Sequence, residues 1–479
     1  MTTNTKFSTN KPESPSSIVG LMIALLVAVF AFQLNTSMLS PALVTMQREL
    51  NTTASQVALT QTVFFTAAAL FSLFLPRLAD SAGRKKVLIG MLVATVAGCI
   101  ISAVAVNVPM LMIGRVLQGV CGPIVPLCLI MLHVRVPDDK RYARLMAIIT
   151  SVNGGIAGVD ALLGGWLAAH YGFRSIFWTM AAIALIAVIM TALYTHESWA
   201  DTKAGMDWIG AVLLVIAIGA LLLAVDEIEK LAAANWVYVI IMLVIAVVAF
   251  IVFWNVEKRK KEPMVTTLYL KQRRTWGLLL TTLLTMTGVF AIMNGIVPAI
   301  AQDAKFGAGL SADVASLATL TPYALAGLVF GPVAGWLTSR YGYHKVLRYG
   351  LVATAIGVIA IMLTASSVSV WALVCVSIFV GITYAGTVNI MLNGLGIVLS
   401  PADNTGYLPG LNAGAFNLGA GLSFAILYAV MTQVGGGSGT MSYVFSVGTG
   451  LVLVVLALVC SFFIPSVEKT EQEARQLAD

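Results

Sequence analysis

Two ionisable side chains lie inside long apolar stretches of this sequence. Asp160 falls within "SVNGGIAGVDALLGGWLAAHYGF" (151–173), and Arg115 is the one basic residue deep within such a stretch. A charged side chain inside a hydrocarbon layer costs at least about 2.5–3.5 kcal/mol, so it is by default functional and paired. Spacing places both side chains roughly 10 Å from the outer ends of their stretches, level with Asn35. The open alternatives are an Arg115 that reaches out to the interface and an Asp160 that only hydrogen-bonds helix backbone.

The elements that hold these residues are apolar runs of membrane length. The chain has 479 residues, 59% of them hydrophobic and 10% charged, with a mean hydropathy of +0.93, whereas a soluble protein carries about 25% charged residues. A helix needs about 20 apolar residues to cross the hydrocarbon layer. The sequence therefore predicts an all-α integral membrane protein with 14 transmembrane helices. The runs are 18–40, 54–75, 87–106, 110–132, 145–167, 175–195, 208–225, 235–254, 276–298, 312–334, 346–366, 370–393, 407–432 and 442–464.

Basic residues indicate the orientation of these runs. With the N-terminus inside, 23 of the 28 Lys and Arg residues lie in segments on the inner side. Short loops keep Lys and Arg in the cytoplasm, so we expect a multi-pass protein of the inner (cytoplasmic) cell membrane with both termini cytoplasmic. The pI near 9.1 comes from these loops and not from one basic face, which argues against nucleic-acid binding. The first 17 residues do not read as a signal peptide.

The sequence shows no pattern typical of a metal site, a disulfide, ATP binding or catalysis. The five cysteines lie inside apolar runs and the four histidines lie near run ends, without metal-ligand spacing. We therefore expect no metal site and no disulfide. The chain has no G-x-x-x-x-G-K-[ST] loop, so ATP is not the direct driver. No nucleophile and base are placed for catalysis. We expect a protein that is not an enzyme and has no cofactor, with a proton gradient as its driver.

Several short motifs resemble one transporter family. "LADSAGRKK" (78–86) is similar to G-x-L-a-D-r-x-G-r-k, the loop signature of the major facilitator superfamily, and 330–347 repeats it weakly. "GRVLQGVCG" (114–122) resembles the fourth-span signature R-x-x-q-G-x-g, and "HYGFRSIFW" (170–178) resembles the entry to the sixth span. "DWIGAVLL" (207–214) resembles the start of the hairpin that fourteen-span drug:proton antiporters insert between their halves. The chain thus resembles this branch along most of its length.

The resemblance implies the major facilitator fold, with 14 transmembrane helices arranged as 6 + 2 + 6. Two six-helix bundles would flank the inserted hairpin. The implied parts are a cytoplasmic N-tail (1–17), an N-terminal six-helix bundle (18–198), an inserted two-helix hairpin (205–256), a cytoplasmic linker (257–275), a C-terminal six-helix bundle (276–466) and a cytoplasmic C-tail (467–479).

Two departures from the branch bear on proton coupling. The first-span signature L-D-x-T-I-V-N-x-A-L-P is replaced by "LNTSMLSPALV" (34–44), so Asn35 stands in place of the carboxylate. The fifth-span signature G-P-x-x-G-G is replaced by "DALLGG", so Asp160 stands in place of glycine. In the family fold the first, fourth and fifth spans lie near one another. We therefore predict that Asp160 takes over from the acid missing at Asn35, pairs with Arg115 and carries the coupling proton.

The charged loop after the second span is the expected gate. In the family such a loop latches the two halves of the transporter together when the cavity faces outward. The residues that match are Asp80, Gly83, Arg84 and Lys85, with Gly83 at a tight turn. Arg84 and Lys85 fit equally well as basic residues of a solvated cytoplasmic loop.

The substrate cavity is expected between the two bundles near mid-membrane. Its candidate lining consists of polar and aromatic residues in the middle of spans, each of which has the alternative of being an interhelical hydrogen bond or a core filler. They are Gln33, Gln61, Phe65, Asn153, Asn294, Tyr323, Tyr384, Asn389, Asn412 and Asn417.

These features together predict a secondary active transporter. We expect it to export a small organic compound or drug by alternating access, as a proton antiporter active in multidrug efflux. The alternative, raised by the changes at Asn35 and Asp160, is a facilitator or symporter of a small organic metabolite. A third interpretation, ranked below both, is a non-transporting membrane sensor. The expected partners are a small-molecule substrate and the lipid bilayer, and the expected state is a monomer.

Overall fold

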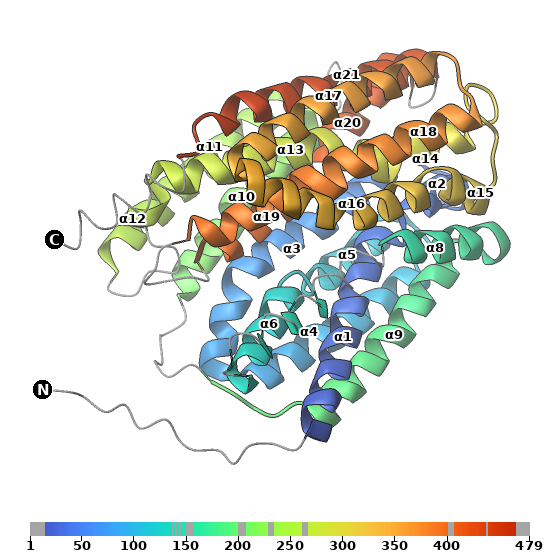
Figure 1. Cartoon of the computed structure of the whole chain (residues 1–479). Coiled ribbons are helices and arrows are strands. Elements are labelled where there is room, and N and C mark those ends of the chain that lie inside the picture. Colours follow the sequence, from blue (N-terminus) through green and yellow to red (C-terminus); the bar gives the residue numbers. More distant parts are fainter. Residues whose placement is uncertain are drawn as a thin grey trace, which may run out of the picture.

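The described part of the protein is built from helices. The structure is a computed structural model that describes residues 15–136, 138, 141–142, 145–146, 148–149, 157–199, 207–228, 234–260, 267–400, 407–436 and 439–465. Every regular element in these ranges is a helix. Figure 1 shows two groups of long helices, one below and one above, which meet at the right of the view. The fold class is therefore all-α.

The first group contains the helices of the N-terminal half. Helix α1 packs against α9 and α6, α4 packs against α9 and α5, and α3 packs against α5. Its members are α1 (Pro15–Ser37), η1 (Ser40–Ala42), α2 (Leu43–Glu49), α3 (Ala54–Ala82), α4 (Arg84–Ala103), α5 (Val108–Gly119), α6 (Ile124–Arg135), α8 (Ala157–Tyr171) and α9 (Phe173–Tyr194). We call this group the first bundle.

The second group, which we call the second bundle, contains the helices after the short α12 (Thr267–Leu270). Helix α13 packs against α20 and α21, and α17 packs against α21. Two of its segments, η3 and η4, are π-helical, a form that often occurs at functional sites. Its members are α13 (Arg273–Ala291), η3 (Ile292–Ile296), α14 (Val297–Gln302), α15 (Ala312–Ala318), α16 (Leu320–Tyr341), α17 (Tyr343–Ser366), α18 (Val370–Val380), η4 (Gly381–Val388), α19 (Asn389–Val398), α20 (Tyr407–Gly435) and α21 (Thr440–Ser461).

Between the two bundles the chain forms a pair of helices, α10 (Trp208–Ile228) and α11 (Trp236–Arg259). The two pack mainly on each other, and α10 also contacts α3 and α20. Helix α11 exposes large apolar side chains such as Val237, Ile240 and Val244. Such a surface is stable in lipid and not in water. The domain boundaries expected from the sequence stay a prediction.

Local sequence signals fix where several helices begin. The side chains of Thr53, Asn107 and Asn235 accept hydrogen bonds from backbone N–H groups in the first turns of α3, α5 and α11, as N-cap residues do. Gly83 and Gly342 join consecutive helices with φ angles of 109° and 81°, a region that favours glycine. These two glycines lie at matching positions of the repeated loop motif. The tight turn predicted at Gly83 is therefore present.

The expected count of fourteen spans, arranged as 6 + 2 + 6, is wrong. Within the described ranges, thirteen helices are long and apolar enough to cross a membrane. The difference lies at the expected fifth span, 145–167. Of this range the structure describes 145–146, 148–149 and 157–167, and the described helix α8 has 15 residues, fewer than the ~20 that a span needs. Among the described residues, thirteen helices and not fourteen have membrane-crossing length.

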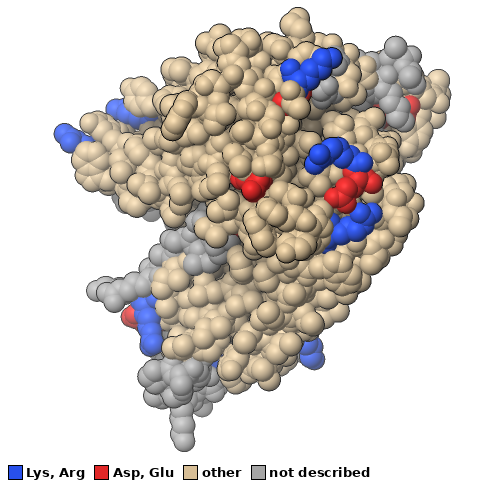
Figure 2. Space-filling view, turned by 90° about the vertical axis from the view of Figure 1, so that its right-hand side faces the viewer, with Lys and Arg blue, Asp and Glu red and all other residues tan. Residues whose placement is uncertain are grey.

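Charged side chains are sparse on the surface. Figure 2 shows one face of the molecule, on which Lys, Arg, Asp and Glu gather in a few small groups on a surface of other residues. One described pair joins the ends of two helices: Arg174 of α9 donates to Glu49 of α2 at 3.0 Å. A surface of this kind is that of a protein embedded in a membrane.

Candidate functional site

Arg115 of α5 is at the centre of a buried polar network. Its side chain is fully buried, and its guanidinium donates to the side-chain oxygens of Gln61 and Gln118 at 2.5 Å each. Longer contacts of 3.4 and 3.5 Å reach the backbone oxygen of Asn35. The Phe64 ring lies 4.1 Å from the guanidinium carbon, a cation–π distance. The charge is thus stabilised by neutral dipoles and an aromatic face contributed by α1, α3 and α5.

Asp160 of α8 lies in a different network. Ser37 of α1 donates its hydroxyl to Oδ2 of Asp160 at 2.5 Å, and Gln33 donates to the Ser37 hydroxyl at 2.9 Å. The Asp160 side chain is 2% exposed, and its Oδ1 has no hydrogen-bond partner among the described residues. A buried carboxylate with one oxygen unbonded is costly to keep ionised. The arrangement therefore suits a carboxyl group that binds a proton.

The structure does not bring Asp160 and Arg115 together as the predicted ion pair requires. Within the described ranges, Arg115 contacts amide and backbone groups and no carboxylate, while Asp160 contacts Ser37. Asn35 belongs to the Arg115 network through its backbone oxygen, while its side-chain amide donates to the backbone oxygen of Ala31 on its own helix at 2.8 Å. The reason is the rotation of α1, which directs Ser37 and not Asn35 at α8. A coupling role for Asp160 stays a prediction.

Helix α8 joins the two bundles directly beside Asp160. Ser316 donates to the backbone oxygen of Ala161 at 3.1 Å, and Thr321 donates to that of Gly158 at 3.2 Å. Gly165 packs against Ala312 so closely that an added Cβ would lie 2.6 Å from the Ala312 oxygen. We call these contacts of α8 with α15 and α16 the α8 junction. A change in the protonation of Asp160 would therefore occur one residue away from Ala161, which contacts the second bundle.

Aromatic side chains from both bundles meet near the centre of the protein. The rings of Phe65 (α3) and Phe424 (α20) are nearly parallel, with centroids 6.4 Å apart and an interplanar angle of 8°. Phe290 (α13) meets both rings edge to face, at 5.1 and 6.1 Å. We call these three residues the aromatic triad. It places Phe65, a predicted cavity residue, at an interface between the bundles.

Three amide candidates are hydrogen-bonded to other residues of the protein, two of them between helices. Asn412 is buried, accepts from Thr282 at 2.7 Å and donates to the backbone oxygen of Leu392 at 3.1 Å, which joins α20 to α13 and α19. Gln61 of α3 accepts a hydrogen bond from Arg115 of α5. Asn389 accepts from Asn393 at 2.9 Å on its own helix. These three side chains have their partners within the protein.

The remaining candidates have varied surroundings. Asn294 is buried in η3 and donates to the backbone oxygen of Phe290 at 3.0 Å. The Tyr384 hydroxyl donates to the sulfur of Met286 at 2.7 Å. Tyr323 and Asn417 are half-buried. Asn153 lies outside the described residues.

The predicted gating loop is tied to the first bundle. Asp80 accepts two hydrogen bonds from Arg84, at 2.7 and 3.0 Å. Lys85 donates its ammonium to the backbone oxygens of Ala192 and Thr195 at 2.7 and 2.8 Å. Among the described residues these contacts stay within α3, α4 and the end of α9. A latch to the second bundle stays a prediction.

Sequence reasoning missed three residues that these networks use. Gln118 stood in the quoted signature R-x-x-q-G-x-g, where its position three residues after Arg115 places both on one helix face. Ser37 had no signal beyond its place two residues after Asn35. Glu197 accepts from the backbone N–H groups of Lys85 and Lys86 at 2.8 and 3.3 Å, and its distance in sequence gave no indication of this.

The sequence of the chain is similar to a known protein family and to individual transporters. The sequence profile of the Major Facilitator Superfamily matches residues 25–206, 203–424 and 309–478. The uridine/deoxyuridine transporter of Lactococcus lactis subsp. cremoris (strain MG1363) is 63% identical over 461 residues, which are 95% of this chain and 96% of that protein. The multidrug resistance protein Stp of Mycobacterium tuberculosis is 27% identical over 367 residues, 76% of this chain and 66% of that protein.

Solved structures show the same fold at low sequence identity. A crystal structure of the nucleoside transporter NupG has a TM-score of 0.62 and 15% identity, and the match covers 92% of this chain and 99% of that one. A crystal structure of a D-xylose–proton symporter has a TM-score of 0.64 and 15% identity, covering 94% and 98%. The expectation of drug export is wrong, because the relative with 63% identity is a nucleoside transporter and the multidrug relative is much more distant.

Proposed function

The chain belongs to the major facilitator superfamily, and on that premise we propose that it carries a pyrimidine nucleoside of the uridine and deoxyuridine class across the cell membrane. The observation that carries the proposal is the 63% identity to a uridine/deoxyuridine transporter over nearly the full length of both chains. A facilitator or symporter of a small metabolite therefore replaces the drug antiporter as the expected activity.

The aromatic triad and Asn294 suit the chemistry of a uracil ring. Uracil is flat, so it stacks on aromatic faces, and base–aromatic stacking contributes about 1–3 kcal/mol per base. Its edge carries one N–H donor between two carbonyl acceptors, and a carboxamide offers both a donor and an acceptor to such an edge. Asn294 stands next to Phe290, and within the described ranges its side-chain oxygen has no hydrogen-bond partner. We place the base beside the triad, with the Asn294 carboxamide hydrogen-bonded to its edge.

Asp160 is the proposed site of proton coupling. It is buried, its Oδ1 has no hydrogen-bond partner in the described part of the chain, and it lies one residue from the α8 junction. Protonation would change its hydrogen bond with Ser37, and so the contact between α1 and α8. A ligand or proton shifts a conformational equilibrium only through different interactions with the two states. The coupling runs through this contact to the junction between the bundles.

The charge pattern sets the proposed orientation. Segment 257–275 holds seven Lys and Arg residues, and such segments stay in the cytoplasm. We place this segment on the cytoplasmic face of the membrane, next to the start of α13.

Uptake of labelled uridine into proteoliposomes that contain the purified chain tests the function. We expect uptake above that of protein-free liposomes, competition by excess deoxyuridine, and no competition by ethidium, a multidrug substrate. A pH gradient imposed across the same liposomes separates a symporter, which accumulates uridine, from a facilitator, which only equilibrates it. Absence of uridine uptake in liposomes that hold correctly folded protein would refute the nucleoside proposal.

A further inference from the structure

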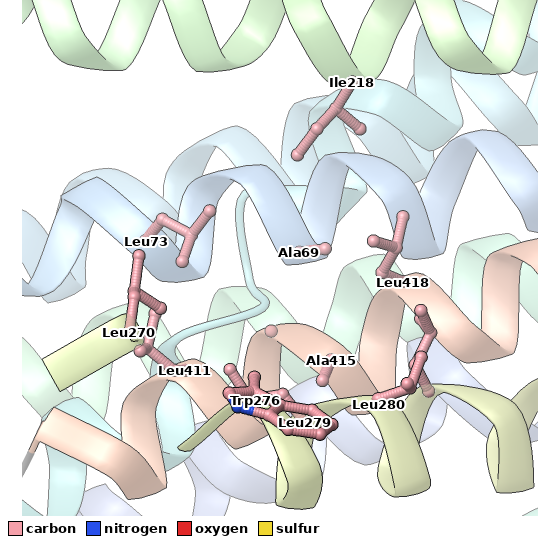
Figure 3. Close-up of a pocket in the computed structure, with 12 residues that line it drawn as sticks. Ala69, Leu73, Ile218, Leu270, Trp276, Leu279, Leu280, Leu411, Ala415 and Leu418 are labelled. Atoms are coloured by element: carbon pink, nitrogen blue, oxygen red, sulfur yellow. The ribbon is translucent and has the colours of Figure 1, made fainter. Parts of the chain in front are cut away.

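An apolar groove of about 440 Å³ lies where the helix pair meets both bundles. It is lined from α3 by Leu73, from α10 by Ile218, from α13 by Trp276 and from α20 by Ala415, among others. Figure 3 shows Ile218 pointing across the opening toward the side chains of α3 and α20. Its lining consists of apolar residues, with the indole nitrogen of Trp276 as a side-chain polar atom. An apolar cavity of this kind does not hold water.

We propose that this groove binds an acyl chain of an anionic phospholipid, whose phosphate is held by Lys271 and Arg274. The proposal goes beyond nucleoside transport and does not depend on it. It assigns a lipid site to the region where the inserted helices join the transporter.

The first argument is exposure to the bilayer. Trp276 and Leu280, on one side of the groove, are 40% and 38% exposed. Both lie on α13, a helix of membrane-crossing length, so the exposed side of the groove faces lipid tails. A lipid chain is the apolar molecule present there at high concentration.

The second argument is charge at one end of the groove. Leu270 and Trp276 line that end, and Lys271 and Arg274 lie between them in sequence. Lys271 is exposed and has no hydrogen bond or ion pair with a described residue. Arg274 donates from Nε to the side-chain oxygen of Gln272 at 2.6 Å, and its two terminal nitrogens have no partner among the described residues, so they can bind a phosphate. Basic side chains at the membrane surface attract anionic lipid at about 1 kcal/mol each.

The third argument is the position of Trp276 itself. It begins the membrane-crossing part of α13 directly after the basic residues. Trp is enriched at the level of the lipid headgroups, where its ring is apolar and its N–H is polar. The groove therefore runs from the headgroup level into the hydrocarbon layer, as an acyl chain does.

The site would connect three parts of the molecule. Leu73 belongs to the first bundle, Ala415 to the second, and Ile218 to the inserted pair. Alternating access moves the bundles relative to each other, so the shape of the groove changes with the conformation. A lipid bound there stabilises the state in which the groove has this shape.

Native mass spectrometry of the purified full chain, with phosphatidylglycerol or phosphatidylcholine added, tests the proposal. We expect one tightly retained phosphatidylglycerol per chain. Two tests alter the site: Ala415→Phe fills the groove, and Lys271→Gln with Arg274→Gln removes the headgroup contacts. Each should lower the retained fraction, the double variant by roughly thirtyfold.

Matched controls exclude general effects on lipid binding or folding. Ala372→Phe adds the same bulk at a half-buried alanine of α18, away from the groove. Arg340→Gln with Lys345→Gln removes two exposed basic residues near another helix end. Both controls should retain phosphatidylglycerol as the parent does. Equal retention by the site variants and the parent, or equal retention of phosphatidylcholine, would overturn the proposal. Because uridine is not used, failure here leaves the transport proposal untouched.

Discussion

A methyl group at Gly165 should force open the α8 junction. In the structure an added Cβ at this position would contact the hydroxyl of Ser316 and lie 2.6 Å from the backbone oxygen of Ala312. Carbon and oxygen atoms that are not bonded approach to about 3.3 Å. The substitution Gly165→Ala therefore requires α8 and α15 to separate by roughly 0.7 Å, and the obstacle is backbone that cannot rotate away.

The size of the effect follows from the cost of overpacking. An extra methyl group in a well-packed interface costs about 1–3 kcal/mol. That cost applies only to the conformation in which the junction is closed, because we expect alternating access to separate α8 and α15 in the other. The ratio of open to closed molecules should then rise by about 5–150-fold. Uridine transport should slow, since closing the junction is part of every cycle.

Distance measurements between spin labels on either side of the junction can detect this shift. Labels at His170→Cys and Val314→Cys report on the ends of α8 and α15, in a background where the exposed Cys375 and half-buried Cys460 are serine. In the Gly165→Ala variant the longer distance should gain population.

Gly90→Ala is the matched control, because a Cβ at this helical glycine of α4 meets nothing within 4 Å. It should leave both the distances and transport unchanged. If Gly165→Ala gives the same distance distribution as the control while the protein remains folded, the closed junction seen here is not a conformation of the transport cycle.

Three further predictions concern the site. Asp160→Asn should abolish accumulation of uridine driven by a pH gradient while exchange of labelled for unlabelled uridine continues; full accumulation would show that Asp160 is structural. Asp80→Asn, which weakens the two hydrogen bonds from Arg84, should slow turnover without weakening uridine binding, and a tenfold loss of binding at unchanged turnover would exclude a gate. Phe424→Ala should raise the KM for uridine about 5–150-fold through lost stacking, whereas alanine at the lipid-exposed Phe445 should have no effect; equal KM values would remove the triad from the site.

The positions of most helices could be predicted from the sequence, and their lengths could not. The second expected span, 54–75, lies within a helix that continues to Ala82. Hydropathy follows the contact between side chains and lipid, but backbone hydrogen bonding does not stop where lipid stops. The π-helical segments η3 and η4, which follow α13 and α18, left no pattern that hydropathy could detect.

The polar residues could be found one by one, but their partners could not. Asp160 and Arg115 were visible because a charge in an apolar run is rare. Which residue each contacts depends on the rotation of three helices about their axes, and a rotation of one residue changes the partner. Asn412 illustrates the converse, since a position that suited a cavity serves to join three helices.

The separation of the two networks changes how coupling could work. If Asp160 paired with Arg115, a proton arriving at the carboxylate would leave a buried cation unpaired, at a cost of several kcal/mol. Arg115 is instead surrounded by Gln61, Gln118 and a backbone oxygen, whose dipoles remain in place whether or not Asp160 is protonated. The protonation of Asp160 then affects the hydrogen bond to Ser37 and, one residue away, the α8 junction. A carboxylate at residue 35 would stand beside Arg115, where the cation would hold it ionised. On this argument the acid could not act in the same way at both positions, and its place in α8 puts proton binding directly beside a contact that alternating access must break.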